Sequence, residues 1–99
     1  MVKLVVAYGV PDDPAAFDEH YADTHRPLAE KIPSVRRFEA GRVLGTPDGS
    51  AAPFYFIAEL WFDDIEQLQA AMGSPEGQAA AADVGTFATG GATLLIAEV

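Results

Sequence analysis

Histidine is the side chain best suited to exchange protons near neutral pH, and this sequence has two, His20 and His25. Both fall in one predicted helix. On a helical wheel with about 100° per residue, His25 lies about 20° beyond the edge of an apolar sector that holds Phe17, Tyr21, Leu28 and Ile32. His20 lies roughly 100° from the centre of that sector. We therefore predict that His25 faces the core and that His20 is a solvent-exposed surface residue.

Pro27 follows His25 closely and should disturb the helix at this point. Proline removes a backbone donor, clashes with the carbonyl group of Asp23 and disfavours helical geometry at Arg26. The helix should kink or restart beside His25, which leaves room next to the imidazole ring. Two interpretations of His25 remain open. It is either the acid–base group of a site or a core histidine bonded to a carbonyl group freed near the kink.

The elements that would position this helix begin with a strand over residues 3–8. The helix itself is predicted over residues 14–31, with Asp13 as its N-cap and Pro14 in its first turn. Extended segments over residues 34–44 and 53–62 follow, joined by a polar, flexible loop at 45–52.

The second half of the chain holds two more helices and a strand. One helix begins at Asp63, forms a capping box with Glu66 and ends at Gly73. A short one follows from Ser74 to about Phe87, and the last strand covers residues 92–99. The order β-α-β-β-α-β predicts an α+β protein with a ferredoxin-like fold, a four-stranded antiparallel sheet with its helices on one face. We expect one domain over residues 1–99.

Two of the predicted strands are apolar on both faces. In the segment 53–62, Phe56 and Leu60 alternate with Ile57 and Trp61, and Glu59 is the single charge. The last strand is similarly two-sided. An antiparallel sheet with one face in water alternates apolar and polar residues, so both faces should be covered. Because the helices cover only one face, we predict a homodimer through the open sheet face.

Composition excludes several classes of function. Lys and Arg total 6 against 15 Asp and Glu, which argues against nucleic acid and anionic membranes as partners. No cysteine is present, so disulfides and thiolate metal sites are excluded. His20 and His25 would diverge by about 140° on an α-helix and could not share a metal ion. Phosphate-loop and serine-hydrolase motifs are also missing. With no signal peptide or membrane-length apolar run, we expect a cytoplasmic protein.

Residues 17–28, with the sequence FDEHYADTHRPL, resemble the EthD (ethyl tert-butyl ether degradation) family. The family pattern F-x-x-x-Y-x-x-x-H-x-P-L is matched by Phe17, Tyr21, His25, Pro27 and Leu28. A later stretch, with SPEG at 74–77 followed by Asp83 and Phe87, resembles the family's S-x-E-G…D…F region. Ser34 departs from the pattern, since the family usually has glycine there, and Ile32 stands for leucine.

The resemblance implies a dimeric α+β barrel, in which two ferredoxin-like sheets pack face to face. It also implies a small-molecule site between the helices and the sheet, with His25 as its histidine. The wider superfamily includes cofactor-free monooxygenases, isomerases, dehydratases and haem-degrading enzymes. The family's founding role, in ether degradation, is poorly defined and is thought to be accessory to an oxygenase system.

Aromatic residues should form the wall of a pocket beside His25. We expect Tyr21, Tyr8, Trp61 and Phe87 there, lining an apolar site for a hydrophobic or aromatic ligand. Asp83 either orients the imidazole ring or caps a helix and faces solvent.

Two hypotheses for the function follow. The first is a cofactor-independent enzyme of a degradation or secondary-metabolism pathway, a monooxygenase, isomerase or dehydratase in which His25 acts as general acid or base. The second is a non-catalytic accessory or ligand-binding dimer that supports an oxygenase system. Haem binding through His25 is a weaker third possibility.

Overall fold

The computed structural model describes all 99 residues. Strand β1 (Val2–Tyr8) is followed by helix α1 (Pro14–His20), which continues into a π-helical turn, η1 (Tyr21–His25), and a last α-helical turn, α2 (Arg26–Ala29). Strands β2 (Arg37–Arg42) and β3 (Phe56–Phe62) form a hairpin. Helices α3 (Ile65–Gly73) and α4 (Pro75–Phe87) then lead to strand β4 (Ala92–Glu98).

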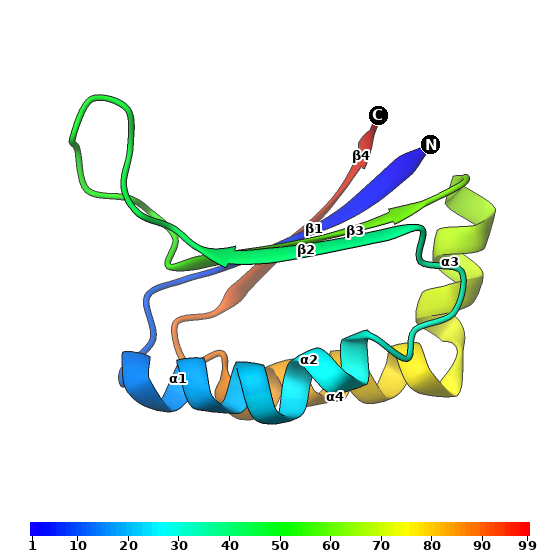
Figure 1. The fold of residues 1–99 in the computed structure, drawn as a ribbon, viewed down its shortest axis with the longest axis horizontal. Coiled ribbons are helices and arrows are strands. Elements are labelled where there is room, and N and C mark those ends of the chain that lie inside the picture. Colours follow the sequence, from blue (N-terminus) through cyan, green and yellow to red (C-terminus); the bar gives the residue numbers. More distant parts are fainter.

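The four strands form one antiparallel sheet in the order β2-β3-β1-β4. The first helical segment and α4 lie side by side under one face of the sheet, and α3 stands at one end of this layer (Figure 1). No helix covers the opposite face, and the loop between β2 and β3 projects away from the helices. This arrangement confirms the predicted ferredoxin-like fold. No helix is long and apolar enough to span a membrane.

Capping residues explain where the helices begin, and one of them corrects the prediction. Asp13 caps α1 as expected, its Oδ1 accepting from the N–H of Ala16. The cap of α3 is Asp64, whose Oδ1 accepts from the N–H of Gln67 at 2.8 Å. The predicted cap, Asp63, instead forms a bidentate ion pair with Arg36. The helix therefore begins one residue later than predicted, and the predicted capping box of Asp63 and Glu66 is wrong.

Both strands of the predicted hairpin are shorter than expected, since β2 runs from Arg37 to Arg42 and β3 begins at Phe56. Residues 34–36 form the turn into β2. Ser34 has a left-handed backbone conformation, with φ of 66°. Serine adopts this conformation at a cost that glycine avoids. This explains why the family pattern usually has glycine where this chain has Ser34. The N–H of Arg36 already pairs with the carbonyl group of Trp61, so the sheet register is set at this turn.

The core lies between the helices and one face of the sheet. It is formed by alternate residues of β1 and β3, with the inward side chains of the helical segments: Leu4, Val6, Tyr8, Phe17, Tyr21, Ala29, Ile32, Ala58, Leu60, Phe62, Leu68, Ala71, Ala80 and Phe87. The helices do not cover the edge strand β4, where Leu94 and Ile96 stay half exposed. The helices therefore cover this face of the sheet only in part, although we expected them to cover all of it.

The open face is less uniformly apolar than predicted. Lys3 and Glu59 form an ion pair at 2.9 Å between β1 and β3. The Lys3 ammonium group and the Arg37 guanidinium group both lie over the ring of Trp61, at 5.3 and 5.1 Å from its centre. Apolar surface remains at β4, where Leu95 is 57% exposed. The open face combines apolar residues with a small set of paired charges.

Gly77 allows α3 and α4 to meet at a close corner. A Cβ atom at this position would lie 2.2 Å from the carbonyl oxygen of Ala71 and 2.7 Å from Cα of Met72. Cβ atoms do not approach other atoms so closely. The contacting atoms belong to the backbone of α3, which cannot shift without moving the helix. Gly85 lies in the same helix, and a Cβ atom there would meet nothing within 4 Å.

Gly77→Ala should therefore destabilise the protein, because the start of α4 would be forced away from α3. Gly85→Ala should stabilise it by roughly 0.5–1 kcal/mol, since alanine loses less backbone entropy in a helix. Thermal unfolding of both variants measures the difference. The two melting temperatures should move in opposite directions, and a shared increase would contradict the tight corner.

Candidate functional site

His25 occupies the last residue of the π-helical turn η1, next to the point where α2 begins. The N–H of Arg26 donates to the carbonyl group of Tyr21, five residues earlier, instead of following the α-helical spacing. Pro27 has no N–H to continue an α-helical ladder here. The predicted disturbance beside His25 is therefore confirmed, and it takes the form of a wider turn that keeps the helix continuous.

Asp83 of α4 holds the imidazole ring of His25 from across the helix layer. Its Oδ2 lies 2.9 Å from Nδ1 of His25. A carboxylate accepts hydrogen bonds, so Nδ1 carries the proton and Nε2 has the free lone pair in the neutral ring. The side chain of His25 is only 7% exposed. The partner is a carboxylate and not the expected backbone carbonyl group, and the ring is buried as both interpretations of His25 require.

His20 joins the same carboxylate, which corrects the prediction that it is a solvent-exposed surface residue. Its Nε2 lies 3.0 and 2.9 Å from the two oxygens of Asp83. Its ring stacks on Phe87 with centroids 4.8 Å apart, and 30% of its side chain is exposed. The π turn is the physical reason, because it closes five residues back and so brings residues five apart to the same side. The expected divergence of the two histidines is wrong for this helix.

The polar cluster of His20, His25, Asp83 and Thr86 sits at one side of a cavity. Thr86 completes the cluster, with Oγ1 at 3.1 Å from Oδ1 of Asp83. No group of three or more histidine, cysteine, aspartate or glutamate side chains in the structure is arranged to hold a metal ion.

The cavity lies between the helices and the sheet and has a volume of about 50 Å³. This is enough for a few water molecules or a small chemical group. Nearly all of its lining is aliphatic or aromatic: Leu4, Val6, Tyr8, Tyr21, His25, Ala29, Ile32, Phe38, Ala58, Leu60, Met72, Ala80, Ala81, Val84 and Leu94. Only the imidazole ring and two tyrosine hydroxyl groups can form hydrogen bonds there.

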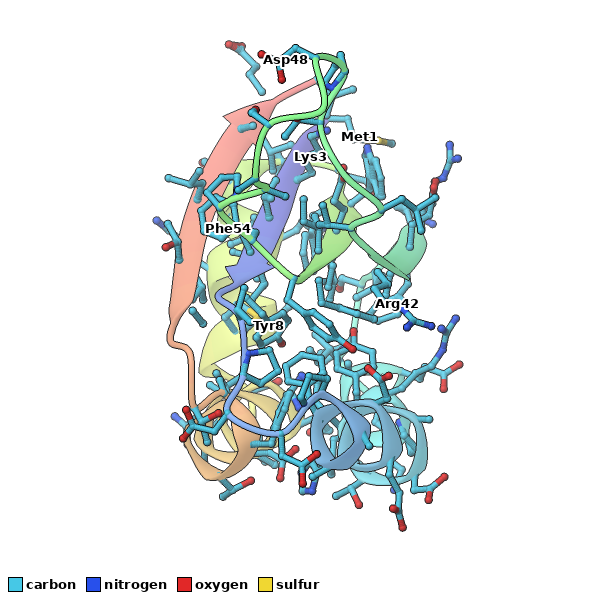
Figure 2. The ribbon with its side chains drawn as sticks, turned by 90° about the vertical axis from the view of Figure 1, so that its left-hand side faces the viewer. Met1, Lys3, Tyr8, Arg42, Asp48 and Phe54 are labelled. Atoms are coloured by element: carbon cyan, nitrogen blue, oxygen red, sulfur yellow. The ribbon has the colours of Figure 1, made fainter.

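Tyr8 brings one hydroxyl group to this cavity from the end of β1. Figure 2 shows Tyr8 where the strand ends above the helix layer. Its Oη lies 3.5 Å from Nε2 of His25, a long contact in which the hydroxyl group donates to the free lone pair. The Tyr8 ring is fully enclosed and packs edge-on against Phe17 and Tyr21. Burial raises the pKa of Tyr8 well above its ordinary value, so the group stays protonated.

Tyr21 supplies the second hydroxyl group, and that group has no partner. Its Oη makes no hydrogen bond and is closed off from solvent, since the residue is only 4% exposed. Burial raises the pKa of Tyr21 to about 12, so it remains a donor. A buried hydroxyl group without a partner costs roughly 1–3 kcal/mol. An oxygen atom of a bound molecule or of water would recover that cost.

The charges of the cluster favour a neutral His25 facing an ionised Asp83. Burial lowers the pKa of His25 below its ordinary value of 6.5, and the Asp83 carboxylate only partly opposes this effect. Burial acts to raise the pKa of Asp83, but hydrogen bonds from His20, His25 and Thr86 together lower it further than burial raises it. At neutral pH the cavity therefore contains an imidazole ring that can accept a proton.

The structure brings together most of the predicted site residues but not Trp61. Phe87 lies beside both histidines, with its centroid 4.9 Å from that of His25, but it is not among the residues that line the cavity, so its expected place on the pocket wall is wrong. Trp61 belongs to the open sheet face, where it contacts Lys3 and Arg37, so its expected place on the pocket wall is wrong. Its position in β3, one residue from the buried Leu60, places it on the opposite face. His20 was missed as a member of the cluster, and Pro27 was the signal that could have indicated it.

The fold and the cavity define a ferredoxin-like α+β protein with a buried histidine that is held by a partly buried aspartate. The EthD domain pattern matches residues 11–91, and the chain belongs to the EthD family.

Three known proteins illustrate the likeness. An uncharacterized 11.0 kDa protein of the thcB–thcC intergenic region of Rhodococcus erythropolis is 47% identical, over 99% of this chain and 94% of its own. An EthD family protein from Bacillus halodurans C-125 is 45% identical over 100% of this chain and 98% of its own, with a TM-score of 0.93. SnoaB, a cofactor-independent oxygenase from Streptomyces nogalater, shares the fold with a TM-score of 0.68 at 18% identity, over 99% of this chain and 91% of its own.

The lowered pKa of His25 predicts a pH-dependent stability. The unfolded chain protonates this residue as the pH falls through about 6.5, whereas the folded chain does so only at lower pH. Between these two values the unfolded state binds more protons, so the free energy of unfolding should fall as the pH falls. Asp83, whose pKa is also lowered, adds its own loss only near and below about pH 4.

Urea unfolding between pH 7.5 and 5.5 measures this slope. His25→Gln should make the slope smaller, because the variant lacks the titrating ring but keeps a polar side chain. Equal slopes in the two proteins would mean that burial does not control the protonation of His25.

Proposed function

We propose that this protein is a cofactor-independent enzyme in which His25 transfers a proton to and from a small, largely apolar substrate bearing a carbonyl oxygen. The observation that carries the proposal is the 2.9 Å contact between Nδ1 of His25 and Asp83, in a ring whose other nitrogen belongs to the cavity wall. A base oriented by a carboxylate is a recurring arrangement in acid–base catalysis.

The proposed step is removal of a proton from the carbon next to the carbonyl group. Nε2 of His25 takes the proton, and the electrons of the C–H bond form a carbon–carbon double bond as negative charge develops on the oxygen. Asp83 stabilises the imidazolium ring that results. The hydroxyl group of Tyr21, which has no protein partner, donates to the charged oxygen. Return of the proton from Nε2 to the same or another carbon completes an exchange or an isomerisation.

The apolar part of the substrate has a place beside the cavity. A groove of about 510 Å³ lies between α3 and β4, lined by Leu4, Leu68, Gln69, Met72, Gly73, Leu94 and Ile96. Leu4, Met72 and Leu94 also line the inner cavity, so the two spaces adjoin. The inner cavity admits the reacting group, and the groove accommodates the hydrophobic remainder.

The comparisons support a catalytic use of this fold without deciding the reaction. SnoaB is described as a cofactor-independent oxygenase, so in that protein the fold supports chemistry without a cofactor. The two closely similar EthD relatives carry no stated activity. The proposal for this chain therefore rests on the histidine–aspartate pair and the two hydroxyl groups.

Exchange of the α-protons of cyclopentanone in deuterium oxide, followed by proton NMR, tests the proposal. The native protein should accelerate the exchange, and His25→Gln should lose roughly 10²–10⁴-fold of that acceleration. Tyr21→Phe should lose roughly 10²-fold, because the developing oxyanion loses a donor. His25→Gln should stay folded, since Asp83 keeps its contacts with His20 and Thr86.

Tyr55→Phe is the matched control for the lost hydroxyl group. Its Oη bonds to Asp18 at 2.8 Å and does not line the cavity, so the exchange rate should not change. If the native protein exchanges the ketone no faster than His25→Gln does, catalysis by His25 is wrong. The cavity would then belong to a non-catalytic ligand-binding or accessory protein.

The same proposal includes a homodimer formed through the open sheet face. Val5, Ile57 and Leu95 are apolar residues of this face on three adjacent strands; Val5 and Ile57 are partly exposed and Leu95 is 57% exposed. The ion pair between Lys3 and Glu59 lies among them and needs no further partner. A second copy of the sheet is the cover whose apolar pattern matches, because a twofold contact places the same patch on both sides.

Leu95→Glu should convert this dimer to a folded monomer. The residue is half exposed in one chain, so a charge is tolerated there, but burying it unpaired in an interface costs roughly 2–5 kcal/mol. Sedimentation velocity at micromolar concentration measures the change. Val10→Glu, in the loop after β1 and 61% exposed, is the control and should remain dimeric. A native protein that sediments as a folded monomer refutes the interface.

A further inference from the structure

Asp83 is one carboxylate that serves two imidazole rings. Its oxygens contact Nε2 of His20 at 2.9 and 3.0 Å, Nδ1 of His25 at 2.9 Å and Oγ1 of Thr86 at 3.1 Å. Its side chain is 12% exposed. A single negative charge of this kind can fully compensate one imidazolium ring but not two. Protonation of one ring must therefore oppose protonation of the other.

The two rings differ in their access to solvent. The side chain of His25 is 7% exposed and lines the cavity, whereas that of His20 is 30% exposed. Nε2 of His20 must carry a proton to donate to the carboxylate. Nδ1 of His20 forms no hydrogen bond in the structure and is the atom at which this ring takes up a second proton.

We propose that His20 is a positioning residue which, through the shared Asp83 carboxylate, keeps His25 neutral and able to accept a proton. This inference rests on the proposed function for its consequence, but the coupling itself exists without a substrate. When solvent protonates His20, its positive charge compensates Asp83. The Asp83 carboxylate then stabilises a proton on Nε2 of His25 less strongly. A positive charge on His20 therefore opposes a second positive charge on His25, and the ring in the cavity stays neutral.

No other charged group competes for this role. His25 faces Asp83 from α4, His20 from α1 and the hydroxyl group of Tyr8 from β1, with Tyr21 beside it in its own turn. His20 faces Asp83 and Thr86 of α4 and stacks on the uncharged ring of Phe87. The positive charge of His20 acts to lower the pKa of His25, whereas Asp83 acts to raise it. Groups coupled in this way titrate as a pair.

Long-range proton–nitrogen NMR of the two imidazole rings between pH 4 and 9 tests the coupling. In the native protein both rings should show two-step titration curves, because each ring responds to the charge of the other. In His20→Gln the side-chain amide keeps a donor near Asp83 but cannot titrate. The His25 curve should then become a single step and move to higher pH. In Asp83→Asn it should move to lower pH.

Thr86→Val is the matched control, because it removes a contact with Asp83 without removing a charge. The two-step curves should persist in this variant. An unchanged His25 curve in His20→Gln, with the remaining amide spectrum preserved, overturns the inference. A titration curve of native His25 that has a single step, and that stays at the same pH in His20→Gln, also overturns the inference.

The ketone exchange assay separates this inference from the proposed function. As the pH is lowered, the exchange rate of His20→Gln should begin to fall at a higher pH than the native rate does. Coupled titration without any exchange activity would refute the proposed function and leave the coupling intact. Exchange that depends on His25 but has the same pH profile in His20→Gln would refute the coupling alone.

Discussion

The carboxylate of Asp83 is the contact on which the candidate site depends. It joins α4 to the first helical segment and selects the tautomer of His25, because an ionised carboxylate requires a proton on the nitrogen that it contacts. The free lone pair is then left on the nitrogen nearest Tyr8. Burial alone would make the ring neutral, and a hydrogen bond alone would orient it. The combination of an apolar cavity with one partly buried acid produces a ring that is oriented and unprotonated at neutral pH.

The π-helical turn is what allows this arrangement. In an uninterrupted α-helix, residues five apart point in different directions, and Asp83 could hold only one of the two histidines. Between Tyr21 and His25 the chain closes its hydrogen bond over five residues, and both rings reach the same carboxylate. Such turns cost some helical hydrogen bonding and occur frequently at functional sites. Pro27 makes the turn less costly, since it has no N–H group to lose from the regular ladder.

The sheet divides the molecule into two surfaces with different roles. The face under the helices encloses the cavity, whose polar groups are one imidazole ring and two hydroxyl groups in an apolar wall. The other face carries apolar residues with a small number of paired charges, and the edge strand β4 is half exposed on both sides. The helices cover one face of the four-stranded sheet and leave the other face open. The proposed second copy would cover the open face, whereas the proposed small molecule would bind on the side of the helices.

Periodicity and capping signals were sufficient to predict the order of strands and helices, because each depends on residues close together in the chain. They also predicted that His25 faces the core and that the helix is disturbed at Pro27, which follow from helical spacing and from the missing N–H group of proline. Two features required the tertiary structure, whereas the place of Trp61 follows from the strand pattern. Asp83 lies 58 residues from His25 along the chain, and only the packing of α4 against the first helical segment brings their side chains into contact. His20 was placed in solvent because the wheel assumed α-helical geometry throughout. Trp61 was assigned to the pocket for its size, whereas the pleat of β3 directs it to the opposite face, since neighbouring residues of a strand alternate between the two sides of a sheet.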